Sequence, residues 1–258
     1  MSISLVQGLL LALMAFVCAI DKCTEAFFWF RPISTAFLTG IILGKVELGL
    51  QCAAVAELAF TGLLTVGGTV PPDGLMAGIM TTVLAYLNPG MTPDAALALA
   101  FPFALLMQWV GIMENTTFAA FMPIMEKQAY DADIKGLFRT MFIGIGITAV
   151  LYSIIVFLST YAIQAPIRTF VENFPEWLMN GFSVAGGIMP AIGLALLLRV
   201  MMTTENAPYL FLGFVAFTFI EMGNVLPIAI VGACVAVLGY FNSKKQVVVE
   251  GGSEDDGI

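Results

Sequence analysis

The sequence predicts an all-α integral membrane protein, a multi-pass helical bundle with broken helices and re-entrant segments. Of its 258 residues, 60% are hydrophobic and only 11% are charged, whereas a soluble domain is about half apolar and about a quarter charged. The apolar residues form long runs, not the alternating pattern of a transmembrane barrel, so the spans should be helices. Gly/Pro breaks inside several runs predict that some of these helices are interrupted.

The most informative segment is residues 46–73, which is apolar enough for a bilayer but carries the carboxylate of Glu57 near its middle. It then breaks into a Gly-Gly-Thr-Val-Pro-Pro-Asp turn at residues 67–73. A buried ionisable group usually faces a cavity or a partner, and irregular backbone at membrane depth is tolerated only against protein or water. We therefore expect a discontinuous helix that lines a polar substrate path. The alternative is a helix that ends at Thr65 and a surface loop that holds an acid.

Residues 3–20, N-terminal to this segment, are long enough to span a hydrocarbon core. Because no basic region precedes them, we expect a retained helix and not a cleaved signal. The aromatic residues 27–30, which have charges on both sides, fit a membrane–water interface or a short re-entrant segment. Proline disfavours a helical residue before it, so a second helix is expected over residues 32–43, short for a full crossing.

Five further apolar segments predict helices, over residues 74–87, 95–113, 141–165, 178–202 and 207–241. The last is too long for one simple span and is expected to be a broken helix or two segments. A second Gly/Pro interruption is expected at residues 186–190. The most polar internal segment, residues 114–139, divides the chain into two halves as a surface arm or a connecting helix, and residues 166–177 form an amphipathic connector.

The expected domain organisation is one polytopic membrane domain over residues 1–243 and a disordered acidic cytoplasmic tail over residues 244–258. Lys244 and Lys245 directly follow the last span, which favours a cytoplasmic C-terminus. The net charge of −8 argues against a nucleic-acid partner. The chain has no histidine and its four cysteines are scattered, so we expect no metal site, no cofactor and no phosphohistidine carrier.

Several spaced motifs resemble those of one family. They are Phe30-Arg31-Pro32, the GIILG sequence at residues 40–44, Glu57, the turn at residues 67–73, GGIMPAIG at residues 186–193 and LRVM at residues 198–201. Together they cover nearly the whole chain, which resembles component IIC, the membrane-channel subunit of mannose/fructose/sorbose-type sugar phosphotransferase systems. Further motifs resemble the N-acetylgalactosamine/galactosamine subunits most closely; they are Leu106-Met107-Gln108, Gly181-Phe182 and the final Asp256-Gly257-Ile258.

The resemblance implies a transport subunit of the bacterial inner membrane that is not an enzyme on its own. It implies a membrane complex with a IID subunit, as a trimer of IIC–IID pairs, and the cytosolic components IIB and IIA. Such a complex carries a sugar to the cytoplasmic side, where a phosphohistidine of IIB phosphorylates it with phosphate from phosphoenolpyruvate. The implied substrate is an amino sugar, N-acetylgalactosamine first, with galactosamine or a mannose-type hexose next.

A sugar site needs carboxylate and amide side chains in a pocket with apolar walls. The expected substrate-binding residues, in order, are Glu57, then Asp73 with the backbone of Gly67, Gly68 and Thr69, and then Gln108 and Asn224. Each has a structural alternative. Glu57 could pair with an arginine or with IID, Asp73 could cap the helix that follows it, and Gln108 could bridge two helices.

Two other functions fit the same residues. An ion-coupled secondary transporter of a small polar solute would use Glu57 or Glu221 as its proton site and would release free sugar. A structural subunit without its own site, which could also serve as a phage or bacteriocin receptor, predicts that Glu57→Gln leaves uptake unchanged. The Gly/Pro breaks at residues 67–72 and 186–190 are candidate hinges for transport, or they only shape re-entrant turns.

Overall fold

A computed structural model describes the backbone of residues 2–63, 70–162, 175–204, 206–219 and 226–250. Every regular element within these ranges is a helix, which confirms the predicted all-α class. The chain divides into two compact units, Met1–Val200 and Met201–Ile258, which are described separately.

Three short helices form the centre of the first unit: α2 (Pro32–Ile42), α3 (Val46–Phe60) and α4 (Gly74–Leu87). At 1.5 Å per residue they are about 16 to 22 Å long, too short to cross a hydrocarbon core of about 30 Å. α4 packs against both of the others, and 12 of its 14 residues are buried. A helix that is apolar all round requires protein on every side, so α4 forms the core of this unit.

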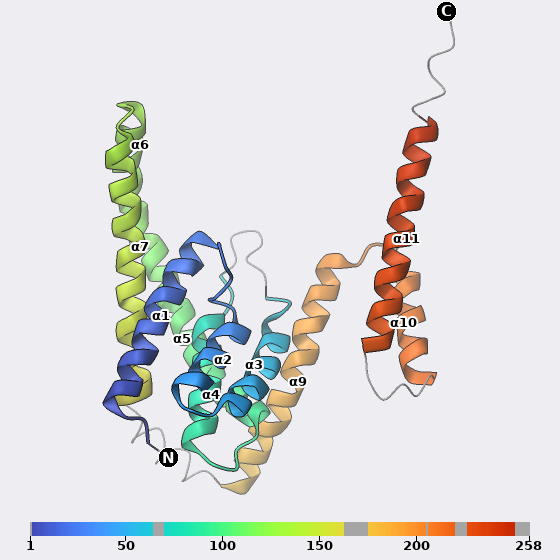
Figure 1. The fold of residues 1–258 in the computed structure, drawn as a ribbon, viewed down its shortest axis with the longest axis horizontal. Coiled ribbons are helices and arrows are strands. Elements are labelled where there is room, and N and C mark those ends of the chain that lie inside the picture. The colour runs from blue at the N-terminus through green and yellow to red at the C-terminus, as the bar shows by residue number, and fades with distance from the viewer. Residues whose placement is uncertain (1, 64–69, 163–174, 205, 220–225, 251–258) are drawn as a thin grey trace, which may run out of the picture. The chain divides into compact units, whose positions relative to one another are not determined.

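Longer helices surround this centre (Figure 1). In chain order the long helices are α1 (Leu5–Thr24), α5 (Pro93–Phe118), α7 (Ile134–Phe157) and α9 (Glu176–Met201). Three short helices follow two of them: η1 (Ala119–Phe121) and α6 (Met122–Tyr130) come after α5, and η2 (Leu158–Ala162) comes after α7. α1 packs along α7, and α5 packs against α3 and α4. Four stretches of the described chain are long and apolar enough to cross a membrane: Leu5–Thr24, Pro93–Tyr130, Ile134–Ala162 and Asn180–Met201.

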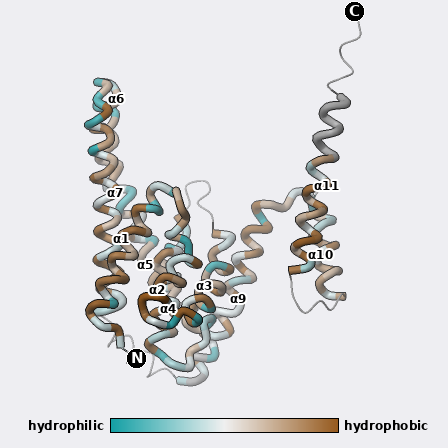
Figure 2. Tube along the Cα trace, in the orientation of Figure 1, coloured by the Kyte–Doolittle hydropathy of each residue, from teal (hydrophilic) through white to brown (hydrophobic). Residues whose placement is uncertain are grey.

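Apolar residues occur along the full length of the long helices (Figure 2), and the exposure of their side chains places them on outer as well as inner faces. On α1, Leu11 and Ala15 are completely buried, whereas Leu9 and Leu13 are more than half exposed. Such a surface would be unfavourable in water, since large exposed apolar patches mark membrane or protein contacts. It is the surface expected of a helix that contacts protein on one side and lipid on the other.

α1 ends four residues later than the sequence predicted, at Thr24 and not at Ile20. Asp21, which is buried, accepts hydrogen bonds from the backbone N–H groups of Phe27 at 2.8 Å and Trp29 at 2.6 Å. These bonds fold the aromatic segment back over the end of α1. Lys22 therefore lies on the last turn of a helix and not in an interfacial loop.

The polar segment over residues 114–139 forms a helical hairpin. α5 continues through η1 into α6, and α6 then packs against the beginning of α7. The turn is made by Ala132, in a left-handed conformation with φ of 55°, and by Asp133, whose carboxylate accepts the Gly136 N–H at 3.0 Å as the N-cap of α7. The segment is thus a connecting helix pair.

The prediction of an interruption at residues 186–190 is wrong, because α9 is continuous from Glu176 to Met201 with Pro190 inside it. Two glycines of α9 serve close packing instead. A Cβ at Gly186 would collide with the carbonyl oxygen of Asp94, and one at Gly193 would lie 2.5 Å from that of Ala59. Glycine is required there because helix backbones approach closely.

The second unit contains α10 (Ala207–Phe219) and α11 (Leu226–Glu250), which pack against each other. The apolar run over residues 207–241 is therefore two segments, one of the two expected outcomes. α11 continues past Lys244 and Lys245, so the helix covers the beginning of the expected tail. The rest of that tail, residues 251–258, lies outside the described residues, and the division into one membrane domain and a tail stays a prediction.

The closest backbone approach between α2 and α3 provides a test of the packing. A Cβ at Gly40 would lie 2.6 Å from the Cα of Gly49, so Gly40→Ala should destabilise the protein by about 2 kcal/mol through overpacking. Gly144→Ala on α7 is the matched control, since nothing lies within 4 Å of its Cβ position, and it should be neutral or stabilising by up to about 1 kcal/mol. Thermal unfolding in detergent measures both, and equal melting temperatures would contradict the close approach.

Candidate functional site

A polar cavity of about 650 Å³ opens between the first-unit helices. Its wall comes from the end of α1 and the loop after it, the turn before α4, and the facing sides of α5 and α7. The polar side chains that line it are Lys22, Cys23, Glu25, Arg31, Asp73, Glu114, Asn115, Thr148 and Tyr152. A second hollow of similar size is lined only by apolar residues of α7 and glycine, so it offers no polar side chain to a ligand.

Asp73 is the best-connected side chain in the cavity. Its Oδ2 accepts hydrogen bonds from the Tyr152 hydroxyl at 2.6 Å and from the Lys22 ammonium at 2.5 Å. Its Oδ1 accepts the Met76 N–H at 2.8 Å, which caps α4. The side chain is 3% exposed. A buried carboxylate is tolerated when it is paired and hydrogen-bonded in this way.

Three distant parts of the chain meet at Asp73. Lys22 comes from α1 and Tyr152 from α7, and the Lys22 ammonium also lies 4.8 Å from the centroid of the Tyr152 ring. Pro71 and Pro72 restrict the preceding backbone to an extended conformation, which brings Asp73 to the N-cap position. Asp73 therefore both caps α4, the alternative raised from the sequence, and lines the cavity predicted for it.

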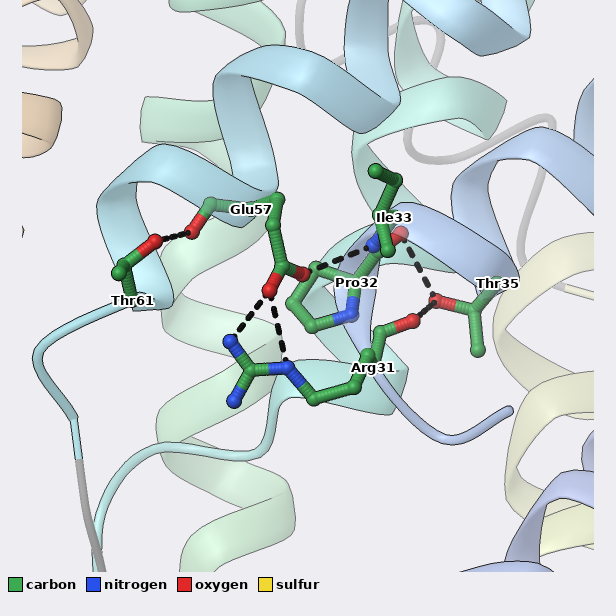
Figure 3. Close-up of polar contacts among 6 residues, drawn as sticks. All are labelled: Arg31, Pro32, Ile33, Thr35, Glu57 and Thr61. Carbon is green, nitrogen blue, oxygen red and sulfur yellow. Dashed lines mark hydrogen bonds and ion pairs between the residues drawn. The ribbon is translucent and has the colours of Figure 1, made fainter. Parts of the chain in front are cut away.

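Glu57 pairs with an arginine, which was one of the two structural alternatives raised from the sequence. Arg31 donates to Glu57 Oε1 through Nε at 2.9 Å and through Nη2, and the Ile33 N–H donates to Oε2 at 3.1 Å (Figure 3). The Ile33 N–H is one of the unpaired donors at the start of α2, so Glu57 closes that helix end from outside. Arg31 lines the cavity and Glu57 does not. The arginine pair is thus observed, while sugar binding by Glu57 stays a prediction.

Gln108 acts as a bridge in the structure. Its Nε2 donates to the carbonyl oxygen of Val70, so α5 holds the segment that leads into Asp73. The side chain is not part of the cavity wall. Four other predicted residues lie outside the part of the chain that the structure describes: Gly67, Gly68, Thr69 and Asn224.

The cavity contains residues that sequence reasoning missed. In the sequence, Lys22 comes just after the first apolar run and Glu114 begins the polar segment over residues 114–139. Tyr152 and Thr148 lie within the predicted span over residues 141–165. Thr148 Oγ1 donates to the carboxylate of Glu114, which joins α7 to α5. One sequence signal could have identified these residues. Each is a polar side chain inside or at the end of a long apolar run, where an unsatisfied polar group is costly.

The first unit combines long spans with short central helices around a polar cavity, an arrangement typical of membrane transport proteins. Residues 5–238 match the family model described as "PTS system sorbose-specific iic component". The chain belongs to this IIC family of the sugar phosphotransferase system, and it is a multi-pass protein of the bacterial inner membrane. The family resemblance of the sequence is thereby confirmed.

Individual relatives agree with this assignment. The chain is 44% identical to the N-acetylgalactosamine permease IIC component 1 of Escherichia coli strain K12, over 95% of this chain and 91% of that protein. A solved structure described as "Structure of membrane protein" superposes with a TM-score of 0.81 at 26% identity, over 93% of this chain and 96% of the other. A second, of the mannose transporter ManYZ in complex with microcin E492, has a TM-score of 0.59 at 25% identity over the same shares.

Proposed function

We propose that this chain moves an amino sugar, N-acetylgalactosamine first and galactosamine or a mannose-type hexose next, across the inner membrane for phosphorylation by a IIB partner. The observation that carries the proposal is the polar cavity around Asp73 in a member of a sugar-specific IIC family. The choice of sugar is supported by the name of the 44% identical relative.

The cavity has the chemistry that a sugar requires. Its volume lies within the range of about 300–1,000 Å³ typical of small-molecule sites. The carboxylates accept hydrogen bonds from hydroxyls, and the Asn115 amide both accepts and donates them. The aromatic side chains that line it offer apolar walls for the ring; they are Phe28, Phe30, Phe60 and Phe118. Asp73 is the proposed central ligand, while Arg31 and its partner Glu57 support the wall.

Other subunits complete the proposed mechanism. The chain contains no histidine, so the phosphohistidine must belong to another protein, which supports a separate IIB component fed by IIA. A IID partner, in a trimer of IIC–IID pairs, is supported by the structural similarity to a ManYZ complex. Lys244 and Lys245 support a cytoplasmic C-terminus by the positive-inside rule.

Uptake of labelled N-acetylgalactosamine into vesicles that hold this chain and its IID partner tests the proposal. We expect sugar phosphate inside only when phosphorylated IIB is present. Free sugar that accumulates on an ion gradient without IIB would overturn the proposal in favour of an ion-coupled transporter. If neither N-acetylgalactosamine nor galactosamine nor a mannose-type hexose is taken up, the sugar assignment is overturned, while membership of the IIC family is unaffected.

A further inference from the structure

Glu114 is a partly buried carboxylate of the cavity wall, and it forms no ion pair with a basic side chain among the described residues. It lies on α5, is half-buried, and accepts a hydrogen bond from Thr148. The part of the chain that the structure describes contains two ion pairs, Lys22–Asp73 and Arg31–Glu57, and Glu114 belongs to neither.

The charge balance of the cavity makes this carboxylate distinctive. The wall contains two cations, Lys22 and Arg31, and each already has an acid partner. The remaining carboxylates are those of Glu25, which is exposed at the end of α1, and Glu114. A partly buried carboxylate without a counter-charge is unfavourable, and a ligand that brings a positive charge into the cavity would supply one.

We infer that Glu114 is a specificity-determining residue that recognises the protonated amino group of a cationic amino sugar. The inference rests on the proposed sugar transport through this cavity. An ammonium group donates a charge-assisted hydrogen bond to a carboxylate, and such a bond is about twice as strong as a neutral one. Thr148 holds one oxygen of Glu114 in place, which leaves lone pairs of the carboxylate for the ligand.

The same geometry predicts a graded response to three sugars. Galactosamine has the ammonium group and should depend most on Glu114. N-acetylgalactosamine has a neutral N–H at the same carbon, and a glutamine at position 114 could still accept from it. Galactose has a hydroxyl there and should depend least, because no charge is involved.

The test is uptake of all three sugars, with the amine protonated, by the IIC–IID complex in vesicles with phosphorylated IIB. Glu114→Gln should raise KM for galactosamine about tenfold, the equivalent of one lost charged hydrogen bond. KM should change less than about threefold for N-acetylgalactosamine and less than about twofold for galactose. Glu126→Gln is the matched control, since Glu126 is exposed on α6 and outside the cavity wall; it should leave all three values unchanged.

Other outcomes separate the two proposals. If the unsubstituted complex transports none of these sugars and no mannose-type hexose either, the proposed function fails. If it transports them and Glu114→Gln changes all three KM values by the same factor, or none of them, the role of Glu114 is overturned while the function stands. Should Glu114→Gln fail to assemble, Glu114→Asp retains the charge and must retain the preference for galactosamine over galactose; loss of that preference would also overturn the inference.

Discussion

Asp73→Asn is expected to lower uptake efficiency, kcat/KM, by about tenfold or more while α4 keeps its N-cap. Asparagine caps helices about as well as aspartate, so the Met76 N–H keeps an acceptor. The substitution removes the charged carboxylate oxygen that pairs with Lys22 and accepts a hydrogen bond from the Tyr152 hydroxyl. Hydrogen bonds to charged groups contribute about 1.5–3 kcal/mol each, and the cavity loses two of them.

Asp73→Ala should have a larger effect on stability than Asp73→Asn. It removes the cap, worth about 1 kcal/mol, and leaves Lys22 without its counter-charge, for a combined loss of about 3 kcal/mol in the free energy of unfolding. Denaturant unfolding of the purified complex in detergent measures this loss. Asp133→Asn is the matched control, since Asp133 caps α7 on an exposed turn, and it should change neither stability nor uptake. Wild-type uptake by Asp73→Asn would show that the Asp73 charge has no part in transport.

The second large effect is expected at the Arg31–Glu57 pair. Arg31→Ala and Glu57→Ala should each destabilise the protein by about 2 kcal/mol, because the pair is partly buried and joins the start of α2 to α3. The double variant should lose less than the sum of the two, with a coupling energy of about 1–2 kcal/mol. A denaturant unfolding series of the four proteins gives this coupling directly.

Uptake by the same four proteins distinguishes a structural Glu57 from a sugar ligand. If Glu57 acts only through Arg31, the double variant should transport no worse than Arg31→Ala. A further rise in KM in the double variant would instead support sugar binding by Glu57. Glu47→Ala serves as the control, since Glu47 is an exposed acid in the first turn of the same helix; we expect it to change stability by no more than about 0.5 kcal/mol.

The sequence was sufficient for the fold class and for most helix starts, because both depend on local properties. Composition and run length identify membrane helices without reference to neighbours. Proline at position 32, the Thr92-Pro93 pair and the Asp73 cap are signals within one turn of the helices that they begin, and α2, α4 and α5 begin there. Each family motif also lies within a short stretch of sequence, so the family resemblance could be recognised without the structure.

Local signals failed where packing decides the outcome. Gly186, Gly187 and Pro190 resemble a helix break, yet α9 passes through them unbroken. Breaking residues are tolerated in membrane helices when neighbours satisfy the backbone, and at Gly186 and Gly193 a small residue is what allows the close approach. The same residue types thus predict a break in isolation and a contact in the folded protein.

The sequence by itself determined that this is a multi-pass helical membrane protein of a sugar-transport family, and it identified Asp73 and Glu57 as the carboxylates to follow. Only the tertiary structure decided their partners. Lys22 lies 51 residues from Asp73 in the chain and Tyr152 lies 79 residues from it, and Arg31 lies 26 residues from Glu57. Periodicity and capping patterns contain no information about contacts over such separations, because those contacts depend on how the short central helices pack against the long spans.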